Sequence, residues 1–472
     1  MAMGHPPQGA HHPGVPALPR PLPIGDRPQA TLAAMEKFVC VAERCEDTCC
    51  RDWAVSIDRP SLDRLKAAIA GTPEGRDRLV RLVVLGSPSR QVDALGQVQL
   101  DEKGTCLLLE ADNRCSVHAA FGEQALPTTC AIFPRTAVAL PDRIEVGGSL
   151  GCPEVARLVL LSSDPMTMRP ASKPMLSRSY VGKSVSGDET DAYARHFLAV
   201  REVLLRCFRR DEAAATRPGP RLGTQLVLAA DFAQRVGELL YAGTPELEGA
   251  RRPFAERILA AEMAETDAPA LRASLDADLE ALDAPGDATA SLIATWLIER
   301  KRLPHSARFG AMIDGTFTSI QREALGRAPA PGDGLSPGAI WSVYARRRDA
   351  LQARVGARSD LIFANYCQHF LLRTPYTDGA TLLEHLTKLG VHLAAVRFLT
   401  VTHPDLAERL SMPAGVDPDG DARTLDRVAI HAIQTFTKAI GHHVEYTETL
   451  LRPAGVTSAF TFGRLVMLAK FV

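Results

Sequence analysis

A chain of 472 residues is long enough for two or three domains with a large buried core. Its composition, 46% hydrophobic and 23% charged, is typical of a soluble globular protein. The net charge of −1 excludes a broad basic surface for nucleic acid or acidic lipid, and no apolar stretch approaches the roughly 20 residues that span a bilayer. We therefore expect a soluble protein that binds neither nucleic acid nor a membrane.

Residues 1–30 are rich in Pro, Gly and His and lack hydrophobic periodicity, which predicts a disordered tail. They contain no positively charged segment followed by an apolar one, so they do not have the pattern of a secretory signal. We expect order to begin near Thr31 and the protein to be cytoplasmic.

Residues 31–163 are predicted to form a small, irregular α+β domain rich in cysteine. The expected elements are a helix at 61–71 with Gly71 as a left-handed cap, a helix at 76–86, a hairpin at 98–110 turning at 102–104, a hairpin at 136–150 turning at Pro141 and Asp142, and a helix opening at Pro153. The glycine-rich run 146–151 is interpreted as a hairpin edge rather than a nucleotide loop, because no βαβ unit surrounds it.

A polar linker at 164–188 leads into 189–472, where apolar residues recur at helical spacing. The segments with this spacing are 189–212, 221–243, 287–303, 359–376, 381–401 and 424–443. Loop residues interrupt the pattern at 326–338 and 412–422. The predicted fold class is therefore mainly α, with a large all-helical domain after the cysteine-rich one.

The cysteines are concentrated at one end of the chain. Eight of the ten are Cys40, Cys45, Cys49, Cys50, Cys106, Cys115, Cys130 and Cys152. Such crowding indicates disulfides, structural zinc or an iron–sulfur cluster. A reducing cytosol favours metal over disulfides, and the adjacent pair Cys49 and Cys50 has Cα atoms only about 3.8 Å apart, below the usual disulfide range of roughly 4.4–6.8 Å.

The sequence spacing of the cysteines does not decide between a zinc site and an iron–sulfur cluster. The gaps between Cys40, Cys45 and Cys49 suit zinc ligands, although no C-x2-C pair is present. The C-x3-C-x2-C signature of radical S-adenosylmethionine enzymes is also absent, because the position that would complete it from Cys45 is Asp52.

Four blocks in this region carry a family resemblance. CVAERCEDTCCRDWAVSID (40–58), GTCLLLEADNRCSVHAAFG (104–122), LPTTCAIFPR (126–135) and GSLGCPEVARL (148–158) resemble, in this order, the flagellin lysine-N-methylase family, part of a wider group of zinc- or iron-chelating cysteine-cluster proteins. The resemblance implies methyl transfer from S-adenosylmethionine to flagellin lysines and a cysteine-bound 4Fe-4S cluster, with a zinc or iron ion as the alternative. The helical remainder has no motif that matches.

All eight clustered cysteines are candidate metal ligands, and by their match to the family blocks a ligand role is favoured for most of these six: Cys45, Cys49, Cys106, Cys115, Cys130 and Cys152. We expect widely spaced members such as Cys45 and Cys115 to converge on one centre. Cys49 and Cys50 should face opposite sides, as adjacent side chains do in extended backbone. Cys207 and Cys367 lie on apolar helix faces and are predicted core residues.

Other residues near the cysteines have less certain roles. His118 is interpreted as packing or hydrogen bonding near the site rather than as a ligand. Trp53 either covers the cluster or is an ordinary core aromatic. Arg135 and Glu154 either orient thiolates or substrate, or form surface ion pairs.

Lysine methylation needs a deprotonated amine, so a nearby carboxylate or tyrosine would assist it. Asp47, Asp52, Asp58 and Tyr366 are available, but the sequence does not choose among them, and we assign no catalytic base, cofactor site or oligomeric state. Two alternative functions stay open. One is a non-enzymatic zinc- or iron-binding module whose helical domain binds a protein partner, and the other is iron–sulfur electron transfer.

Overall fold

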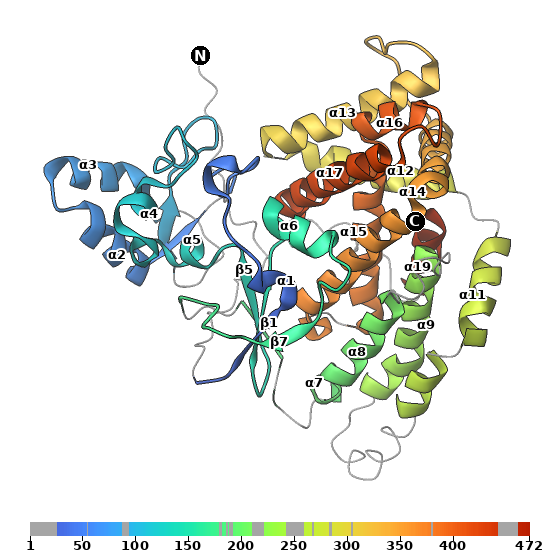
Figure 1. Cartoon of the computed structure of the whole chain (residues 1–472), viewed down its shortest axis with the longest axis horizontal. Coiled ribbons are helices and arrows are strands. Elements are labelled where there is room, and N and C mark those ends of the chain that lie inside the picture. Colours follow the sequence, from blue (N-terminus) through green and yellow to red (C-terminus); the bar gives the residue numbers. More distant parts are fainter. Residues whose placement is uncertain are drawn as a thin grey trace. The chain divides into compact units, whose positions relative to one another are not determined.

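The computed structural model describes residues 26–53, 55–86, 94–178, 182–185, 187, 192–209, 221–241, 259–266, 269–282, 286–303, 305–378, 381–441 and 461–472. These residues form two compact units (Figure 1). The first contains the residues up to Leu158 with Thr167–Ser184 and a short segment ending at Ser306, and the second contains Val159–Met166 and the remaining residues from Val185 onward. Most of the predicted tail lies outside the described residues.

A five-stranded sheet lies in the first unit, with strand order β7-β1-β6-β5-β8. Its strands are β1 (Gln29–Leu32), β5 (Arg135–Ala139), β6 (Ile144–Gly148), β7 (Met168–Pro170) and β8 (Lys183–Ser184). The hairpin predicted at 136–150 is confirmed: β5 and β6 pair antiparallel, and the Leu140 N–H donates to the Arg143 carbonyl at 2.8 Å across the turn.

The glycine-rich run enters β6 in the predicted hairpin, where Gly147 pairs with Thr136, and not in a nucleotide loop. Two other expectations about this sheet need correction. The predicted polar linker supplies β7 and β8, because its short extended stretches find partners in β1 and β5. Regular structure also starts at Gln29, slightly before Thr31, because Gln29 pairs in parallel with Ile144.

A smaller sheet with the order β2-β4-β3 packs with helices in the same unit. It is formed by β2 (Ser56–Asp58), β3 (Val83–Leu85) and β4 (Ala94–Val98). The helices and 3₁₀ turns of the first unit are α1 (Ala33–Glu36), η1 (Ala42–Arg44), α2 (Arg59–Ile69), α3 (Pro73–Leu82), α4 (Ser116–Phe121), η2 (Glu123–Ala125), α5 (Thr128–Ile132) and the start of α6 (Pro153–Leu160).

The predicted helix boundaries here are partly wrong. Helix α2 begins at Arg59 because the Asp58 carboxylate accepts from the Ser61 N–H at 2.7 Å, and it ends at Ile69, with Gly71 outside the left-handed region. The helix expected at 76–86 stops at Leu82, and the β-branched pair that follows continues as β3, paired with β4. The helix expected from Pro153 is confirmed as α6.

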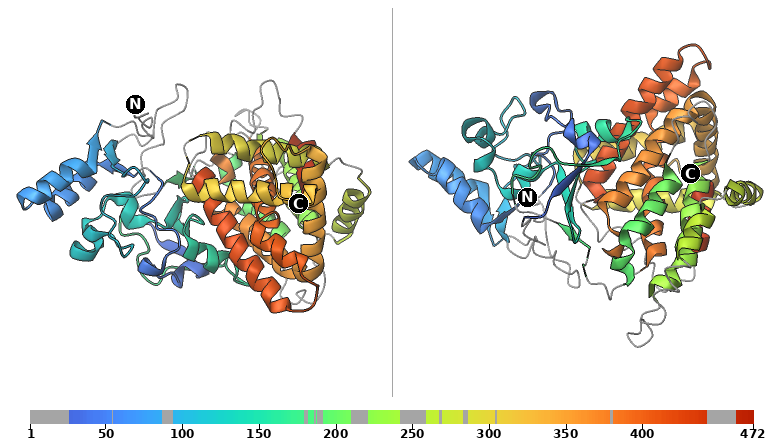
Figure 2. Two further views of the ribbon diagram at one scale, coloured as in Figure 1. Left: turned by 90° about the horizontal axis from the view of Figure 1, so that it is seen from above. Right: turned by 60° about the horizontal axis from the view of Figure 1, so that its bottom comes forward.

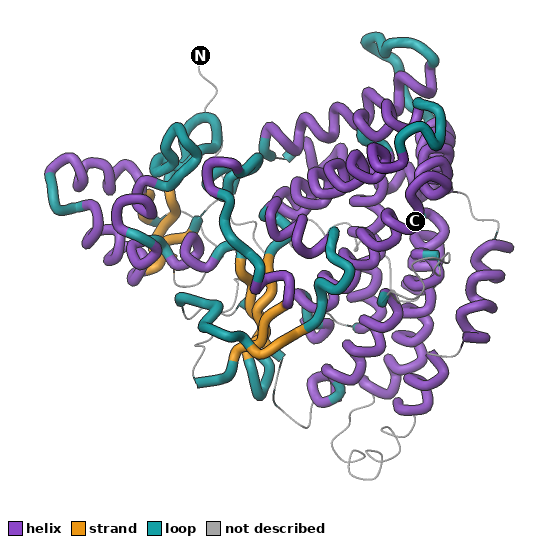
Figure 3. Tube along the Cα trace, in the orientation of Figure 1, coloured by secondary structure: helices purple, strands orange, loops and turns teal. Residues whose placement is uncertain are grey.

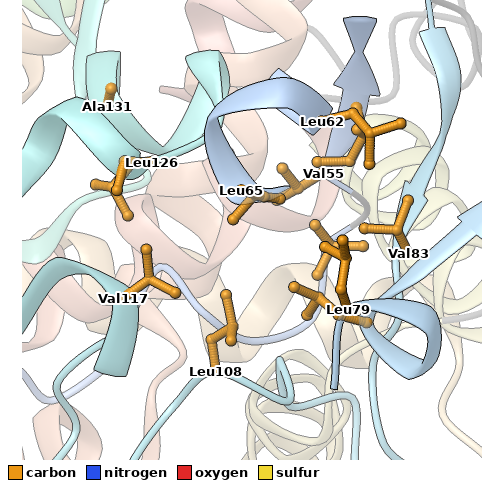
Figure 4. Packing of buried hydrophobic residues seen from close by; sticks show 13 residues of the cluster. Val55, Leu62, Leu65, Leu79, Val83, Leu108, Val117, Leu126 and Ala131 are labelled. Carbon is orange, nitrogen blue, oxygen red and sulfur yellow. The ribbon is translucent and has the colours of Figure 1, made fainter. Parts of the chain in front are cut away.

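One hydrophobic cluster forms the core of the α2–α5 part of this unit, and its apolar side chains are shown in Figure 4. It includes Ile57, Leu65 and Leu82, which have no exposed surface. Burying each of these side chains stabilises the fold by about 1.5–3 kcal/mol. The partly buried side chains packed against the cluster include Trp53, Cys106, Cys115 and Cys130. Three of the eight clustered cysteines therefore pack on an apolar core.

The hairpin expected at 98–110 is reduced to a turn. Gly104 lies in the left-handed region with φ of +74°, and its N–H donates to the Asp101 carbonyl at 3.0 Å. Beyond this turn only an isolated bridge joins Leu100 to Cys106. The turn prediction is thus confirmed, but the long strands are not formed.

The second unit is helical, as predicted (Figures 2 and 3). Its helices are α7 (Ala192–Arg195), α8 (Phe197–Phe208), α9 (Leu222–Tyr241), α11 (Pro269–Ala281), α12 (Gly286–Arg302), α13 (Ala307–Leu325), α14 (Pro337–Arg373), η4 (Tyr376–Asp378), α15 (Leu382–Val401), α16 (Pro404–Ser411), α17 (Pro418–Phe436), the π-helical turn η5 (Thr437–Gly441) and α19 (Thr461–Phe471). The loops predicted at 326–338 and 412–422 separate helices as expected but are shorter than predicted, because α14 already begins at Pro337 and α17 at Pro418. The mainly α fold class is confirmed.

The core of this unit is apolar and aromatic. Helix α15 is buried along most of its length, and the Tyr344 ring of α14 stacks on Phe471 of α19 with centroids 4.4 Å apart. Cys207 on α8 and Cys367 on α14 have no exposed surface, which confirms their prediction as core residues. Within the described ranges, no helix is both long and apolar enough to cross a lipid bilayer.

Candidate metal centre

All eight clustered cysteines lie within the first unit, on loops, at the starts of helices or, for Cys130, within a short helix. Cys40 and Cys45 flank η1, and Cys49 and Cys50 follow it; Cys106 follows the Gly104 turn, Cys115 is the N-cap of α4, Cys130 lies in α5, and Cys152 directly precedes α6. All are free thiols. Their interactions divide them into two groups.

The first group, which we call the inner group, consists of Cys50, Cys106, Cys115 and Cys130. The Cys106 N–H donates to the Cys50 carbonyl at 2.9 Å, which fixes these two loops side by side. An isolated bridge joins Leu109 to Cys115, so the short loop between Cys106 and Cys115 folds back on itself. Cys130 packs on the same hydrophobic cluster as Cys106 and Cys115.

The thiols of the inner group lie close enough to raise one another's pKa values. Burial raises the pKa of the Cys130 thiol well above its usual value. The neighbouring thiols that raise this pKa further are those of Cys50, Cys106 and Cys115. Burial likewise raises the pKa of Cys106 to about 11, and the thiols of Cys50 and Cys115 add to the effect. The sulfurs of Cys130 and Cys106 therefore lie close enough to the neighbouring thiols for their charges to raise the pKa.

The second group, the outer group, contains Cys40, Cys45 and Cys152. Burial raises the pKa of Cys152 to about 11, with further increases from the thiols of Cys45 and Cys40. Burial also raises the pKa of Cys45, whose neighbouring thiol is that of Cys40. An ion pair between Glu46 and Arg157 ties the Cys45 loop to α6, which begins just after Cys152.

Cys49 lies between the two groups. Its pKa is raised well above the usual value, first by a hydrogen bond with the Cys50 side chain, then by burial and by the thiols of Cys50, Cys130 and Cys40. Its residue is exposed, whereas Cys50 is half-buried. Cys106 and Cys115 interact with the thiol of Cys50. Cys49 and Cys50 lie in a turn rather than in extended backbone, and their side chains are hydrogen-bonded to each other, so the expectation that they face opposite sides is wrong.

Backbone N–H groups point at several of the sulfurs. The Leu108 N–H donates to the Cys106 sulfur at 3.5 Å. The other such pairs are Asp47 with Cys45, Val117 and His118 with Cys115, and Glu154 and Val155 with Cys152. These hydrogen bonds lower the thiol pKa values, against the effect of burial. They favour the thiolate, which is the form that binds soft metals.

The thiols fit a soft-metal centre by number and chemistry, but not a single closed ion site. Among the described residues, no group of three or more His, Cys, Asp or Glu side chains is arranged to hold a metal ion. Thiolates on one tetrahedral zinc lie about 3.8 Å from each other, as a Zn–S distance near 2.3 Å requires. A multinuclear iron–sulfur cluster spreads its cysteine ligands over several irons and so needs wider spacing. Which cysteines bind metal stays a prediction.

The side chains around the thiols take mostly structural roles. The Trp53 indole N–H donates to the Cys49 carbonyl, and the Trp53 and Phe133 rings pack edge to face with their centroids 5.0 Å apart. His118 is exposed on α4. The guanidinium of Arg135 lies 5.8 Å from the centre of the Phe38 ring. Glu154 pairs with Arg157 at 2.9 Å, which matches the ion-pair interpretation.

Two arginines near the cysteines were not singled out from the sequence. The positive charge of Arg78 in α3 partly offsets the rise in the pKa values of Cys106 and Cys115, and its side chain donates to the Ser116 hydroxyl at 2.8 Å. Arg157 anchors the outer group through Glu46 and Glu154. Arg157 lies within a family block, but nothing in the sequence places Arg78 near Cys106.

The structure does not select a catalytic base. Asp58 is engaged as the N-cap of α2. Tyr366 is buried in the helical unit, and burial raises its pKa above the usual value. Asp52 lies in the left-handed region with φ of +65°, and its N–H donates to the Gly104 carbonyl at 2.9 Å.

Comparison with known proteins gives distant relatives. The chain is 26% identical over 151 residues to a protein named lysine-N-methylase from Salmonella typhimurium, an alignment that covers 31% of this chain and 36% of that protein. It is 27% identical over 160 residues to the flagellar biosynthetic protein FliU of Salmonella muenchen, covering 33% of this chain and 91% of FliU.

A lysine-N-methylase from Salmonella choleraesuis is similar to the same degree, with 26% identity over 151 residues. The alignments thus span about a third of the lysine-N-methylases' length. No family model and no solved structure matches the chain. These relatives suggest the family that the cysteine blocks resemble, at low identity.

Proposed function

We propose that this protein is a cytoplasmic protein-lysine N-methyltransferase that uses S-adenosylmethionine to methylate flagellin and holds a 4Fe-4S cluster on its clustered cysteines. The observation that carries the proposal is the similarity to proteins named lysine-N-methylase. The similarity to FliU, named as a flagellar biosynthetic protein, supports a flagellar substrate. The gathering of eight thiols in one unit supports a soft-metal centre.

The chemistry requires a neutral lysine amine. Its nitrogen attacks the sulfonium methyl group, so that the new N–C bond forms as the S–C bond breaks, and S-adenosylhomocysteine leaves. The amine also loses a proton to a base or to solvent. When bound, a cysteine-ligated cluster would supply an iron centre, and its thiolates would link the loops that carry Cys45, Cys106 and Cys130.

The test uses the full chain purified without oxygen. We expect iron and acid-labile sulfide, visible absorbance, binding of S-adenosylmethionine by calorimetry, and methyl groups on flagellin lysines by mass spectrometry. A colourless zinc protein that does not bind the cofactor and leaves flagellin unmodified would refute the proposal. That result would favour the non-enzymatic metal module whose helical unit binds a protein partner.

A further inference from the structure

We infer that Arg135 binds the carboxylate of S-adenosylmethionine, and that the purine of this methyl donor lies on the aromatic side chains next to it, Phe38, Trp53 and Phe133. All four residues belong to the first unit. The inference rests on the proposed function, because it names this chain's own residues for the donor that a lysine N-methyltransferase needs. It does not depend on which cysteines bind metal.

Arg135 is a half-buried cation without a counter-charge. Within the described residues, no acceptor lies within hydrogen-bond distance of its buried Nε atom, and no carboxylate pairs with its guanidinium. Arg143, near the other end of the same hairpin, differs, because its guanidinium donates to Glu145 at 2.8 Å and to Asp142 at 3.0 Å. A buried N–H donor without an acceptor costs free energy. Arg135 is therefore suited to an acceptor that a ligand brings.

Backbone and ring contacts fix the position of this guanidinium. Arg135 pairs with Gly148 in the β5–β6 hairpin, and just before it the Pro134 carbonyl accepts from the Ser149 N–H at 2.7 Å. The central carbon of the guanidinium lies 5.8 Å from the centre of the Phe38 ring, which is a cation–π distance. A cation that a strand and a ring already hold in place loses little conformational freedom when it binds a ligand.

A carboxylate is the acceptor that fits this group best. The planar guanidinium presents its N–H groups as a fork that matches the two oxygens of a carboxylate, and the charge makes these hydrogen bonds strong. S-adenosylmethionine has a single carboxylate, at the end of its amino-acid part and away from its purine. With this carboxylate on Arg135, the purine is free to reach neighbouring side chains.

The neighbouring side chains are aromatic. Phe38, Trp53 and Phe133 are half-buried, so each keeps part of its surface accessible. The Trp53 and Phe133 rings contact each other, and Phe133 lies two residues before Arg135. The hydrogen bond from the Trp53 indole to the Cys49 carbonyl fixes this ring beside a cysteine-bearing loop. Aromatic rings of this kind stack on purine bases. The cation and the rings together match the two ends of the methyl donor.

The experiment measures by calorimetry how tightly the full chain, purified without oxygen, binds S-adenosylmethionine and its decarboxylated form, which lacks the carboxylate. We expect Arg135→Gln to weaken binding of S-adenosylmethionine by about 10- to 100-fold, as for loss of hydrogen bonds to a charged group, and to leave binding of the decarboxylated form unchanged. Lys37→Gln, which removes an exposed cation one residue before Phe38, is the control and should leave both affinities unchanged. If Arg135→Gln changes neither affinity, or weakens both equally, the inference is wrong.

A second measurement uses the unmodified chain alone, in case the glutamine variant fails to fold. We expect this chain to bind S-adenosylmethionine about 10- to 100-fold more tightly than the decarboxylated form, and equal affinities would overturn the inference. A chain that binds no S-adenosylmethionine would overturn both this inference and the proposed function. A chain that binds the donor and methylates flagellin, but with an affinity independent of Arg135, would overturn the inference alone.

Discussion

Comparing Cys49→Ala with Cys207→Ala distinguishes a metal ligand from a packing residue. The burial of each side chain sets the loss of stability expected for each variant. Cys49 is exposed, so removing its sulfur opens no cavity in the core. Cys207 has no exposed surface, and Cys207→Ala should cost about 1 kcal/mol, as for loss of one buried heavy atom. Against a total stability of roughly 5–15 kcal/mol, both variants should stay folded.

We expect Cys49→Ala to lose part of the bound metal and most of the methylation activity, because the centre loses a thiolate and the loop loses its anchor. Cys207→Ala should keep both. The assay combines metal analysis, visible absorbance and mass spectrometry of flagellin, with circular dichroism to confirm folding. If Cys49→Ala methylates flagellin at the unmodified rate with full metal content, the reasoning that this thiol supports catalysis is refuted.

Leu65→Ala in the hydrophobic cluster should lower the free energy of unfolding by about 2–5 kcal/mol in urea denaturation, because Leu65 has no exposed surface. The control Val80→Ala, at a side chain 78% exposed on the neighbouring helix, should change this free energy by under about 0.5 kcal/mol. Equal effects of the two substitutions would contradict this placement of the core. Gly104→Ala should destabilise the protein by more than about 1 kcal/mol in thermal melts, because φ is +74° and an added Cβ would lie 2.8 Å from the Asp52 carboxylate oxygen. The control Gly71→Ala, where the added Cβ meets open space, should be neutral or slightly stabilising in the same measurement. Burial lowers the pKa of His392 from 6.5 to about 4, so the unfolded chain binds a proton at higher pH than the folded one, and stability should fall by up to about 3 kcal/mol as the pH drops from 6.5 to 4. His392→Phe should flatten that part of the stability profile, and an unchanged slope would show that this ring does not titrate on unfolding.

Much of the local structure could be predicted from the sequence. The 3.6-residue periodicity that predicts α9, α12 and α15 is a local property, since each helix forms its hydrogen bonds within its own segment. The β5–β6 hairpin is equally local, because its turn residues and both strands lie within one short stretch. The concentration of thiols before residue 153 can also be read directly from the sequence.

The arrangement of those thiols was decided by tertiary structure. Cysteine spacing alone does not show that the Cys106 N–H donates to the Cys50 carbonyl, or that the Cys45 thiol lies near enough to Cys152 to raise its pKa, because both depend on loops far apart in the chain. The same holds for β7 and β8, polar stretches that become strands only because β1 and β5 offer unpaired edges. Arg78 reaches the inner cysteines because α3 packs on the cluster that also borders them. The residues able to bind metal are thus evident from composition, and their division into two groups comes from long-range packing and hydrogen bonding.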